Sequence, residues 1–290
     1  RTRSGHASVN VKKERTSQYS VFEARMSTEF PTSSLMIVDI MLTELCNRTC
    51  DFCPRAVDYP NLNLHMDLDL FSKICDDLAY INYLNRVLLC GFGENLLYKN
   101  IYEAIQILRS KLPNNEYLQI VTNGDRLKKE TILKLYDAGL NKIYVSCYDG
   151  IEQVKHFQSL FDELSIDSNN YYFLHYYKPP EENYGFVHYS NRGGKLFSDT
   201  SYLDRGCNSP FYAMQINWDG KVLLCSHDWT KSVVCGDLKT EYLKNIWLHS
   251  PQYKQYRSML SHKRDIGPCN KCNVVGTLYG DKSRQLLHNA

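Results

Sequence analysis

The chain has 290 residues, of which 43% are hydrophobic and 23% are charged, as in an ordinary soluble globular protein. The formal net charge is only +2, so no broad basic surface is expected for nucleic acid. No apolar run approaches the roughly 18 residues that a membrane-spanning helix requires, and no secretory signal sequence is recognised. These features argue against a membrane or nucleic-acid partner.

Residues 1–34 are expected to form a flexible leader, because residues 1–20 are polar and basic with little to bury. From residue 35 to residue 194, short apolar runs alternate with amphipathic segments, which is typical of βαβ units and a parallel sheet. The expected strands span residues 35–42, 86–91, 117–122, 142–147, 171–176 and 186–190. The expected helices span residues 67–81, 101–112, 128–138 and 151–164.

About six strands are too few for a closed eight-stranded barrel. We therefore expect an α/β fold over residues 35–194, either an open partial (β/α)6 TIM-like barrel or a doubly wound sheet. After residue 194 the pattern changes, because Asp219-Gly220 marks a hairpin turn between apolar runs at 212–217 and 221–225. A helix is expected over residues 242–260. We predict a second module of β-hairpin plus helix over residues 195–290.

Eleven cysteines are many for a soluble chain of this length. Disulfides in an oxidising compartment and metal-binding thiolates in a reducing one are the two explanations. The number is odd and several cysteines stand at spacings typical of metal ligands, which favours metal. Cys75 and Cys90 are exceptions and are expected in the hydrophobic core, where a free thiol behaves as a small apolar group.

Three of the cysteines follow the first expected strand as C-x3-C-x2-C, at Cys46, Cys50 and Cys53. One loop with three thiols can wrap an iron–sulfur cluster, which usually has four thiolate ligands. One iron would then keep an open coordination position, as catalytic metal sites do. A zinc knuckle is the alternative that the spacing alone leaves open.

With Phe52 before the third cysteine, this motif resembles the signature of the radical S-adenosylmethionine (SAM) superfamily. The resemblance implies a [4Fe-4S] cluster whose open iron binds the amino and carboxylate groups of SAM. It also implies a flavodoxin-like or ferredoxin-like electron donor, and cleavage of SAM to methionine and a 5′-deoxyadenosyl radical. It selects the partial barrel as the fold of residues 35–194.

Motifs at the ends of later strands fit the same resemblance. Glycines at 91 and 93 let the backbone approach a ligand closely, and the following glutamate could accept hydrogen bonds from the SAM ammonium. Polar residues that end the third and fourth strands stand where the family often contacts ribose. The residues expected to bind SAM are Phe52, Gly91, Gly93, Glu94, Thr122, Asn123, Ser146 and Arg192.

Four further cysteines lie in the C-terminal module, at Cys207, Cys225, Cys269 and Cys272. Their spacing, with a glycine between the first two and C-x2-C at the end, resembles the SPASM/twitch extension of radical SAM enzymes. The short twitch form implies one auxiliary [4Fe-4S] cluster with four cysteine ligands, suited to electron transfer. A structural zinc ion is the alternative.

The fully ligated auxiliary cluster favours oxidation, in which the substrate loses a hydrogen atom, a proton and an electron. The layout also resembles radical SAM dehydrogenases of aminocyclitol alcohols, so we expect oxidation of a small polar substrate such as a sugar or an aminocyclitol. Modification of a peptide and epimerisation are alternatives, and a non-catalytic electron-transfer protein is a more remote one.

Three residues are candidates for the chemistry itself. Arg192 follows the last expected strand and could orient the substrate or assist proton loss, although a SAM or structural contact is an equal alternative. His175, at the end of the fifth strand, could act in the same way or be a core histidine. Cys147 could donate a hydrogen atom to a substrate radical, as an epimerase would require, or pack at its strand end.

Overall fold

The computed structural model describes residues 31–177, 190–201, 203–274, 276 and 280–288. Most of the expected leader and of the expected strand 186–190 lie outside the described residues. Among the described residues, no helix has the length and apolar character needed to cross a membrane.

One mixed sheet forms the centre of the molecule, in the order β5-β4-β3-β2-β1-β6-β7-β8. Neighbouring strands from β5 to β6 are parallel, whereas β6, β7 and β8 pair antiparallel. The strands are β1 (Ile37–Ile40), β2 (Arg86–Leu89), β3 (Leu118–Thr122), β4 (Lys142–Cys147), β5 (Tyr171–His175), β6 (Ala213–Ile216), β7 (Lys221–Leu223) and β8 (Val234–Asp237).

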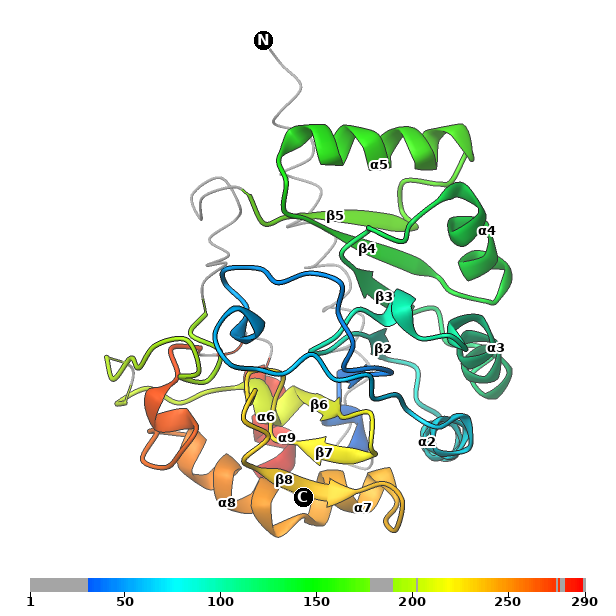
Figure 1. Cartoon of the computed structure of the whole chain (residues 1–290). Coiled ribbons are helices and arrows are strands. Elements are labelled where there is room, and N and C mark those ends of the chain that lie inside the picture. The colour runs from blue at the N-terminus through cyan, green and yellow to red at the C-terminus, as the bar shows by residue number, and fades with distance from the viewer. Residues whose placement is uncertain (1–30, 178–189, 202, 275, 277–279, 289–290) are drawn as a thin grey trace.

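Helices connect the parallel strands and cover one side of the sheet, and the loop between β1 and the first of them lies on the other side (Figure 1). They are α2 (Leu68–Tyr80), α3 (Ile101–Lys111), α4 (Lys129–Asp137) and α5 (Ile151–Glu163). Asp67 caps the start of helix α2, because its Oδ1 accepts a hydrogen bond from the backbone N–H of Asp69 at 2.9 Å. The apolar residues of α2 recur three and four positions apart and are buried, so this face packs on the sheet.

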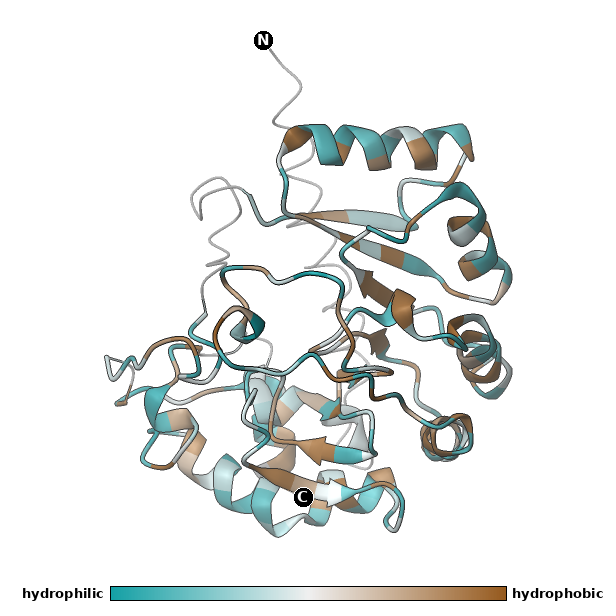
Figure 2. Ribbon diagram, viewed as in Figure 1, coloured by the Kyte–Doolittle hydropathy of each residue, from teal (hydrophilic) through white to brown (hydrophobic). Residues whose placement is uncertain are grey.

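The expected α/β partial barrel is confirmed, with a difference in its sixth strand. Strand β6 pairs in parallel with β1, with Asp39 opposite Gln215. The hairpin that was expected in a separate C-terminal module therefore extends the same sheet. The division at residue 194 stays a prediction. Figure 2 shows that the helices carry both hydrophobic and hydrophilic residues, as helices packed on one side of a sheet do.

The single helix expected over residues 242–260 is wrong, because two helices span this range. These are α7 (Leu243–His249) and α8 (Pro251–Leu260). Pro251 has no N–H to continue α7, and the Ser250 hydroxyl instead accepts a hydrogen bond from the N–H of Tyr253 at 3.3 Å, which starts α8.

Short elements complete the described chain. Helix α6 (Ser209–Tyr212) precedes β6, and α9 (Gly280–His288) packs against α6 and against the turn η1 (Pro31–Ser34). The 3-10 turns η2 (Pro54–Ala56), η3 (Asn95–Leu97) and η5 (Cys269–Lys271) follow the expected cluster-binding and SAM-binding motifs or lie within them.

Candidate active site

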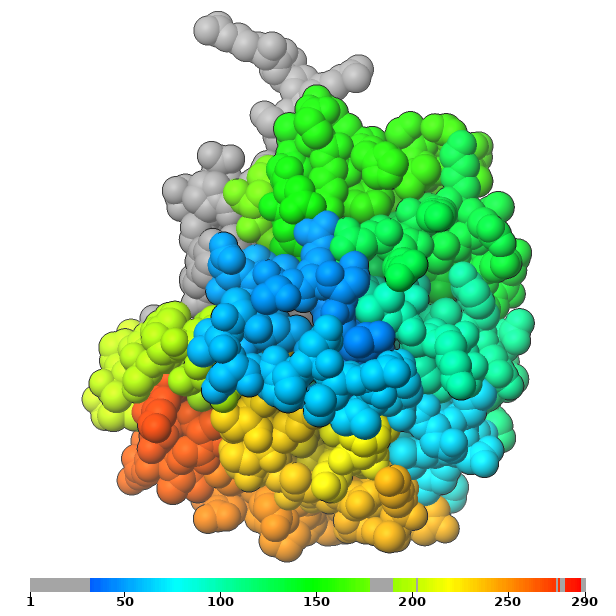
Figure 3. Space-filling model, viewed as in Figure 1, coloured from blue at the N-terminus to red at the C-terminus, as the bar shows by residue number. Residues whose placement is uncertain are grey.

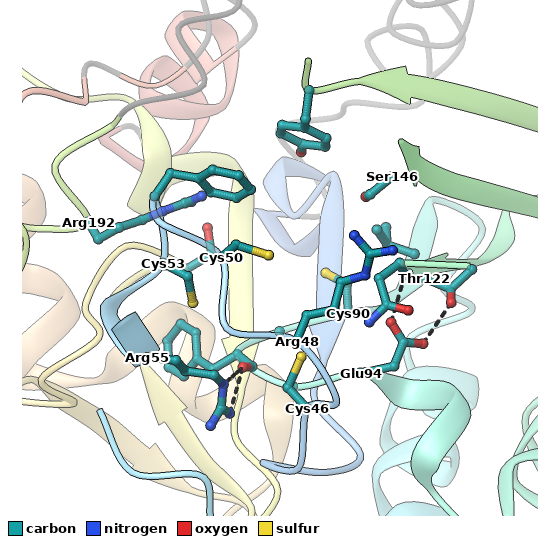
Figure 4. A pocket seen from close by; sticks show the side chains of 18 of the residues that line it. Cys46, Arg48, Cys50, Cys53, Arg55, Cys90, Glu94, Thr122, Ser146 and Arg192 are labelled. Carbon is teal, nitrogen blue, oxygen red and sulfur yellow. Dashed lines mark hydrogen bonds between the residues drawn. The ribbon is translucent and has the colours of Figure 1, made fainter. Parts of the chain in front are cut away.

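A cavity of about 350 Å³ lies at the carboxyl ends of the parallel strands. The loop that follows β1 forms one wall and lies across the centre of the face seen in Figure 3, between β4–β5 and the C-terminal part. Cys46, Cys50 and Cys53 line this wall, and Figure 4 shows Glu94, Thr122 and Ser146 in the same cavity. The motifs that follow β1, β2, β3 and β4 or end them therefore meet at one edge of the sheet.

The three cysteines of this wall fit an iron–sulfur cluster. All three are free thiols and are partly exposed to the cavity. Burial, and then the neighbouring Cys53 and Cys46, raise the pKa of Cys50 to about 11. Three thiols close enough to disfavour each other's ionisation need a positive partner to become thiolates together. The irons of a cluster supply that charge.

Hydrogen bonds of one asparagine and one arginine side chain fix the shape of the loop. Asn61 accepts a hydrogen bond from the Cys46 N–H and donates one to the Cys46 carbonyl, both at 2.9 Å. Arg55 donates to the Phe92 carbonyl at 2.8 Å and also to the Glu44 carbonyl. The backbone at the start of the cluster-binding motif is therefore held by side chains that follow the motif in the same loop.

Arg48, between the first two cysteines, ties the loop to two strand ends. Its Nη2 atom lies 2.6 Å from the Asp125 carboxylate, which follows β3, and 2.8 Å from that of Asp149, which follows β4. The Asp125 carboxylate also accepts a hydrogen bond from Asn47 at 2.6 Å. The Arg48 guanidinium lowers the pKa of Asp125, so the carboxylate is ionised at neutral pH.

Glu94 is 3% exposed and organises the opposite wall. Its carboxylate accepts hydrogen bonds from the Thr122 hydroxyl and the Asn123 N–H, each at 2.7 Å. Burial raises the pKa of Glu94, while these two hydrogen bonds oppose that rise. The buried acceptor, joined to the end of β3, fits the predicted role toward the SAM ammonium, which remains a prediction.

The glycines before Glu94 are required by close packing of the backbone. A Cβ atom on Gly93 would lie 2.2 Å from the Thr43 carbonyl oxygen and 2.9 Å from that of Leu45. A Cβ atom on Gly91 would lie 2.7 Å from the Met41 side chain. The end of β2 therefore packs directly against the segment that leads into the cysteine loop, and no other residue type fits there.

Three aromatic rings stack on the side of the cavity near β4 and β5. The Phe52 ring centroid lies 5.4 Å from that of Tyr148 and 6.1 Å from that of Tyr176. Phe52 was predicted as a cofactor contact, whereas the two tyrosines were missed. Their positions directly after β4 and β5 were the signal in the sequence, because the chemistry of parallel sheets gathers there.

Strand register decides which of the other predicted residues reach the cavity. Ser146 and Leu174 are opposite each other on β4 and β5, and both line it. Cys147 and His175 are the next opposed pair, so they point to the other face. The Cys147 thiol is buried 3.8 Å from the Val145 carbonyl, and the His175 ring nitrogen lies 3.2 Å from the Tyr177 hydroxyl. Neither residue lines the cavity.

Arg192 lines the cavity on the side of the C-terminal part. Its φ angle of +51° is unusual for a residue other than glycine, and its buried Nε atom has no hydrogen-bond partner among the described residues. The neighbouring Asn191 donates to the Phe197 carbonyl at 3.0 Å and to the Lys271 carbonyl, which holds this strained backbone beside Cys272. The structure thus places the arginine at the cavity wall, and its contact with SAM or substrate remains a prediction.

The four C-terminal cysteines form a second thiol site. Cys207, Cys225, Cys269 and Cys272 are all free and partly buried. Burial and then the charges of Cys269 and Cys207 raise the pKa of Cys225 well above its ordinary value. The four thiols therefore lie within electrostatic reach of one another, and like the first set they fit a cluster that supplies positive charge.

A buried arginine joins the chain segments that carry these thiols. Arg264 is 1% exposed and donates to the Gly206 carbonyl at 3.0 Å and to the Cys272 carbonyl at 2.7 Å. Within the described ranges, no three or more His, Cys, Asp or Glu side chains close around a point where one metal ion would fit.

Other residues that line the cavity were not expected. Asp39, on β1, and Gln215, on β6, lie on its floor, and His227 and Trp229 follow the second cysteine of the auxiliary set. Cys90 was expected in the core, which is wrong, because this partly exposed residue lines the cavity and its thiol donates a hydrogen bond to Asp39. Of these residues, the sequence gives a signal only for Asp39, because it is the one carboxylate in the apolar run of residues 35–42.

A three-thiol loop and a buried glutamate at the carboxyl edge of a partial barrel, beside a four-thiol site, define a radical SAM enzyme with an auxiliary cluster. Comparison with known families agrees with this class. The model of the radical SAM superfamily matches residues 40–152, and that of the SPASM iron–sulfur cluster-binding domain matches residues 207–273. The chain therefore contains a radical SAM domain followed by a C-terminal SPASM domain. SAM and two [4Fe-4S] clusters are its cofactors.

Among individual proteins, the chain is similar to the S-adenosyl-L-methionine-dependent 2-deoxy-scyllo-inosamine dehydrogenase of Niallia circulans. The two are 26% identical over 82% of this chain and 93% of that protein. The crystal structure of BtrN in complex with AdoMet and 2-DOIA is similar in fold, with a TM-score of 0.69 and 25% identity over 83% of this chain and 94% of that one. A GTP 3′,8-cyclase of Staphylococcus haemolyticus is 35% identical, but the similarity covers only 37% of this chain and 32% of the cyclase.

The packing of Gly93 predicts the effect of a single methyl group. In Gly93→Ala the Cβ would overlap the Thr43 carbonyl and push β2 away from the cysteine loop. We expect loss of iron from the first site and loss of SAM binding, measured by iron analysis and equilibrium dialysis after anaerobic reconstitution. Gly267→Ala is the control, because its Cβ would meet nothing closer than 3.7 Å. Full iron content and SAM affinity in Gly93→Ala would contradict the packing described.

Because Arg48 forms ion pairs with the ends of two strands, Arg48→Ala should leave the cysteine loop less firmly attached to the sheet. We expect the free energy of unfolding to fall by about 1 kcal/mol, since the pairs are partly exposed. We also expect a chelator to remove iron from the first site several times faster. Arg126→Ala removes an exposed arginine next to Asp125 and serves as the control. Equal rates of iron loss in the two variants would show that Arg48 does not position the loop.

Proposed function

We propose that the chain oxidises a hydroxyl group of a small polar substrate, and that this substrate is an aminocyclitol alcohol. One observation carries the oxidative reading. Ser226 and His227, directly after the auxiliary ligand Cys225, line the same cavity as the three cysteines of the first site. A substrate in this cavity is therefore close both to the source of the radical and to an electron acceptor.

The cofactors supply the difficult chemistry: SAM on the first cluster provides a hydrogen-abstracting 5′-deoxyadenosyl radical, and the auxiliary cluster accepts an electron. The protein binds and orients the substrate between them. Arg192 directs an unpaired guanidinium nitrogen into the cavity. A fixed cation there stabilises the negative charge that develops on the substrate oxygen as its proton leaves.

The substrate class rests on similarity. The Niallia circulans relative is named for oxidation of 2-deoxy-scyllo-inosamine, an amine-bearing ring alcohol, and its alignment covers 82% of this chain and 93% of that protein. The epimerase alternative loses support because the Cys147 thiol, its proposed hydrogen donor, packs in the core away from the cavity. No contact among the described residues specifically favours a peptide substrate.

Two further expectations belong to the same proposal. Reduction of the first cluster requires an external one-electron donor, for which a flavodoxin-like or ferredoxin-like protein is the chemical class. Iron–sulfur clusters of this kind react with oxygen, so the protein is expected to work in the cytoplasm.

The proposal predicts a stoichiometric oxidation. Anaerobically reconstituted and reduced protein with SAM and 2-deoxy-scyllo-inosamine should form 5′-deoxyadenosine and the ring ketone in a ratio of about one to one, measured by mass spectrometry. In Cys269→Ala/Cys272→Ala the ketone should fall at least about tenfold while 5′-deoxyadenosine still forms, because the electron acceptor is lost.

The control is Cys75→Ala, a cysteine of the α2 core that lines neither site. Wild-type protein that forms 5′-deoxyadenosine but incorporates solvent deuterium into an unoxidised product would contradict the oxidative reading and support epimerisation.

A further inference from the structure

The floor of the cavity contains buried polar atoms without partners. Neither amide atom of Gln215, a residue 1% exposed, makes a hydrogen bond within the described chain. The same holds for Oδ1 of Asp39 and for the indole nitrogen of Trp229. All three residues line the cavity. Buried polar groups in native proteins are almost always satisfied, so this set calls for a ligand.

The geometry of the sheet places two of these groups side by side. Asp39 and Gln215 are opposite each other on the parallel strands β1 and β6, and both side chains point to the cavity face. Glu94, Thr122 and Ser146, the groups expected to bind SAM, belong to β2, β3 and β4 or follow them. The floor formed by β1 and β6 is therefore a different part of the cavity.

The chemistry of the pair defines what it can bind. A carboxylate accepts hydrogen bonds, and a primary amide both donates and accepts them. A hydroxyl group can satisfy both atoms of the amide, and an ammonium group matches the carboxylate in hydrogen bonding and in charge. Two neighbouring ring substituents, an amine and a hydroxyl, would satisfy both side chains.

We propose that Asp39 and Gln215 are the specificity-determining pair for the substrate, and that they bind a protonated amine and an adjacent hydroxyl of a polyhydroxylated ring. This rests on the proposed function for the reaction at the same site, but it concerns recognition and not oxidation. Asp39 takes the amine, Gln215 takes the hydroxyl, and the Trp229 indole N–H is a further donor to a ring oxygen.

The surroundings of Asp39 agree with a cationic ligand. Burial raises the pKa of this carboxyl group to about 6, against the opposing effects of Arg86 on β2 and of the hydrogen bond from Cys90. A desolvated carboxylate gains more from a bound cation than an exposed one does, because charges interact more strongly where water is excluded. The pair therefore discriminates between an amine and a hydroxyl at the same ring position.

The test compares two matched pairs of probes that differ in one group. These are 2-deoxy-scyllo-inosamine with 2-deoxy-scyllo-inositol, and glucosamine with glucose. Binding to the SAM-loaded, reconstituted enzyme is measured by calorimetry, separately from ketone formation. We expect wild-type protein to prefer the amine in at least one pair, and Asp39→Asn to weaken amine binding roughly 10- to 100-fold with little change for the hydroxyl compound.

Gln215→Leu should weaken binding of both members of a pair about equally, because the adjacent hydroxyl is common to both. Asp39→Glu should restore part of the preference for the amine. Asp137→Asn, an exposed residue on α4, is the control. Iron content and SAM affinity should be unchanged in all variants, which separates a role in recognition from a structural one.

Three results would overturn the proposal: no amine preference in wild-type protein, an unchanged preference in Asp39→Asn, or a loss of SAM or iron equal to the loss of amine binding. These outcomes are distinct from failure of the proposed function. If wild-type protein binds the amine through Asp39 but forms no ketone, the proposed oxidation is contradicted and the proposed recognition pair is still supported. Ketone formation with an unchanged preference in Asp39→Asn would instead support the oxidation and contradict the recognition pair.

Discussion

The alternation of side chains along parallel strands is the constraint on which the site depends. All the parallel strands end at one edge, but only every second residue of each strand faces the cavity. On β4 and β5, Ser146 and Leu174 therefore face the cavity, whereas Cys147 and His175 face the opposite side. On β1 and β6 it places a carboxylate and an amide on the cavity floor. A shift by one residue in any strand would replace these polar groups with core residues.

Cluster chemistry needs thiols to be held in place by something other than the metal. In this chain, arginines provide much of that support. Arg48 ties the first loop to the ends of β3 and β4 through two carboxylates, and Arg264 joins the segments of the auxiliary site through backbone carbonyls. A guanidinium has five donors in a rigid plane, so one side chain can fix several chain segments.

Much of the fold and the grouping of seven cysteines into two sets could be predicted from the sequence, because both follow local patterns. The sequence does not show, however, which residues of a fully buried strand face the cavity and which face the core. All six residues of β4 are buried, so its hydropathy does not show that Ser146 faces the cavity and Cys147 the core. Contacts between distant segments were equally hidden: Arg48 and Asp149 are 101 residues apart in the sequence. Asp39 was visible as a charge in an apolar run, but its partner Gln215 appears only when β6 pairs with β1.

The central claim is that two cysteine sites hold two clusters on either side of one cavity. Mössbauer spectroscopy with iron and sulfide analysis tests it most directly, on anaerobically reconstituted wild-type protein and on Cys46→Ala/Cys50→Ala/Cys53→Ala. We predict about eight irons per chain in the wild type and about four in the variant, all in [4Fe-4S] form. About four irons in the wild type and none in the variant, with zinc at the C-terminal thiols, would contradict the account and remove the electron acceptor.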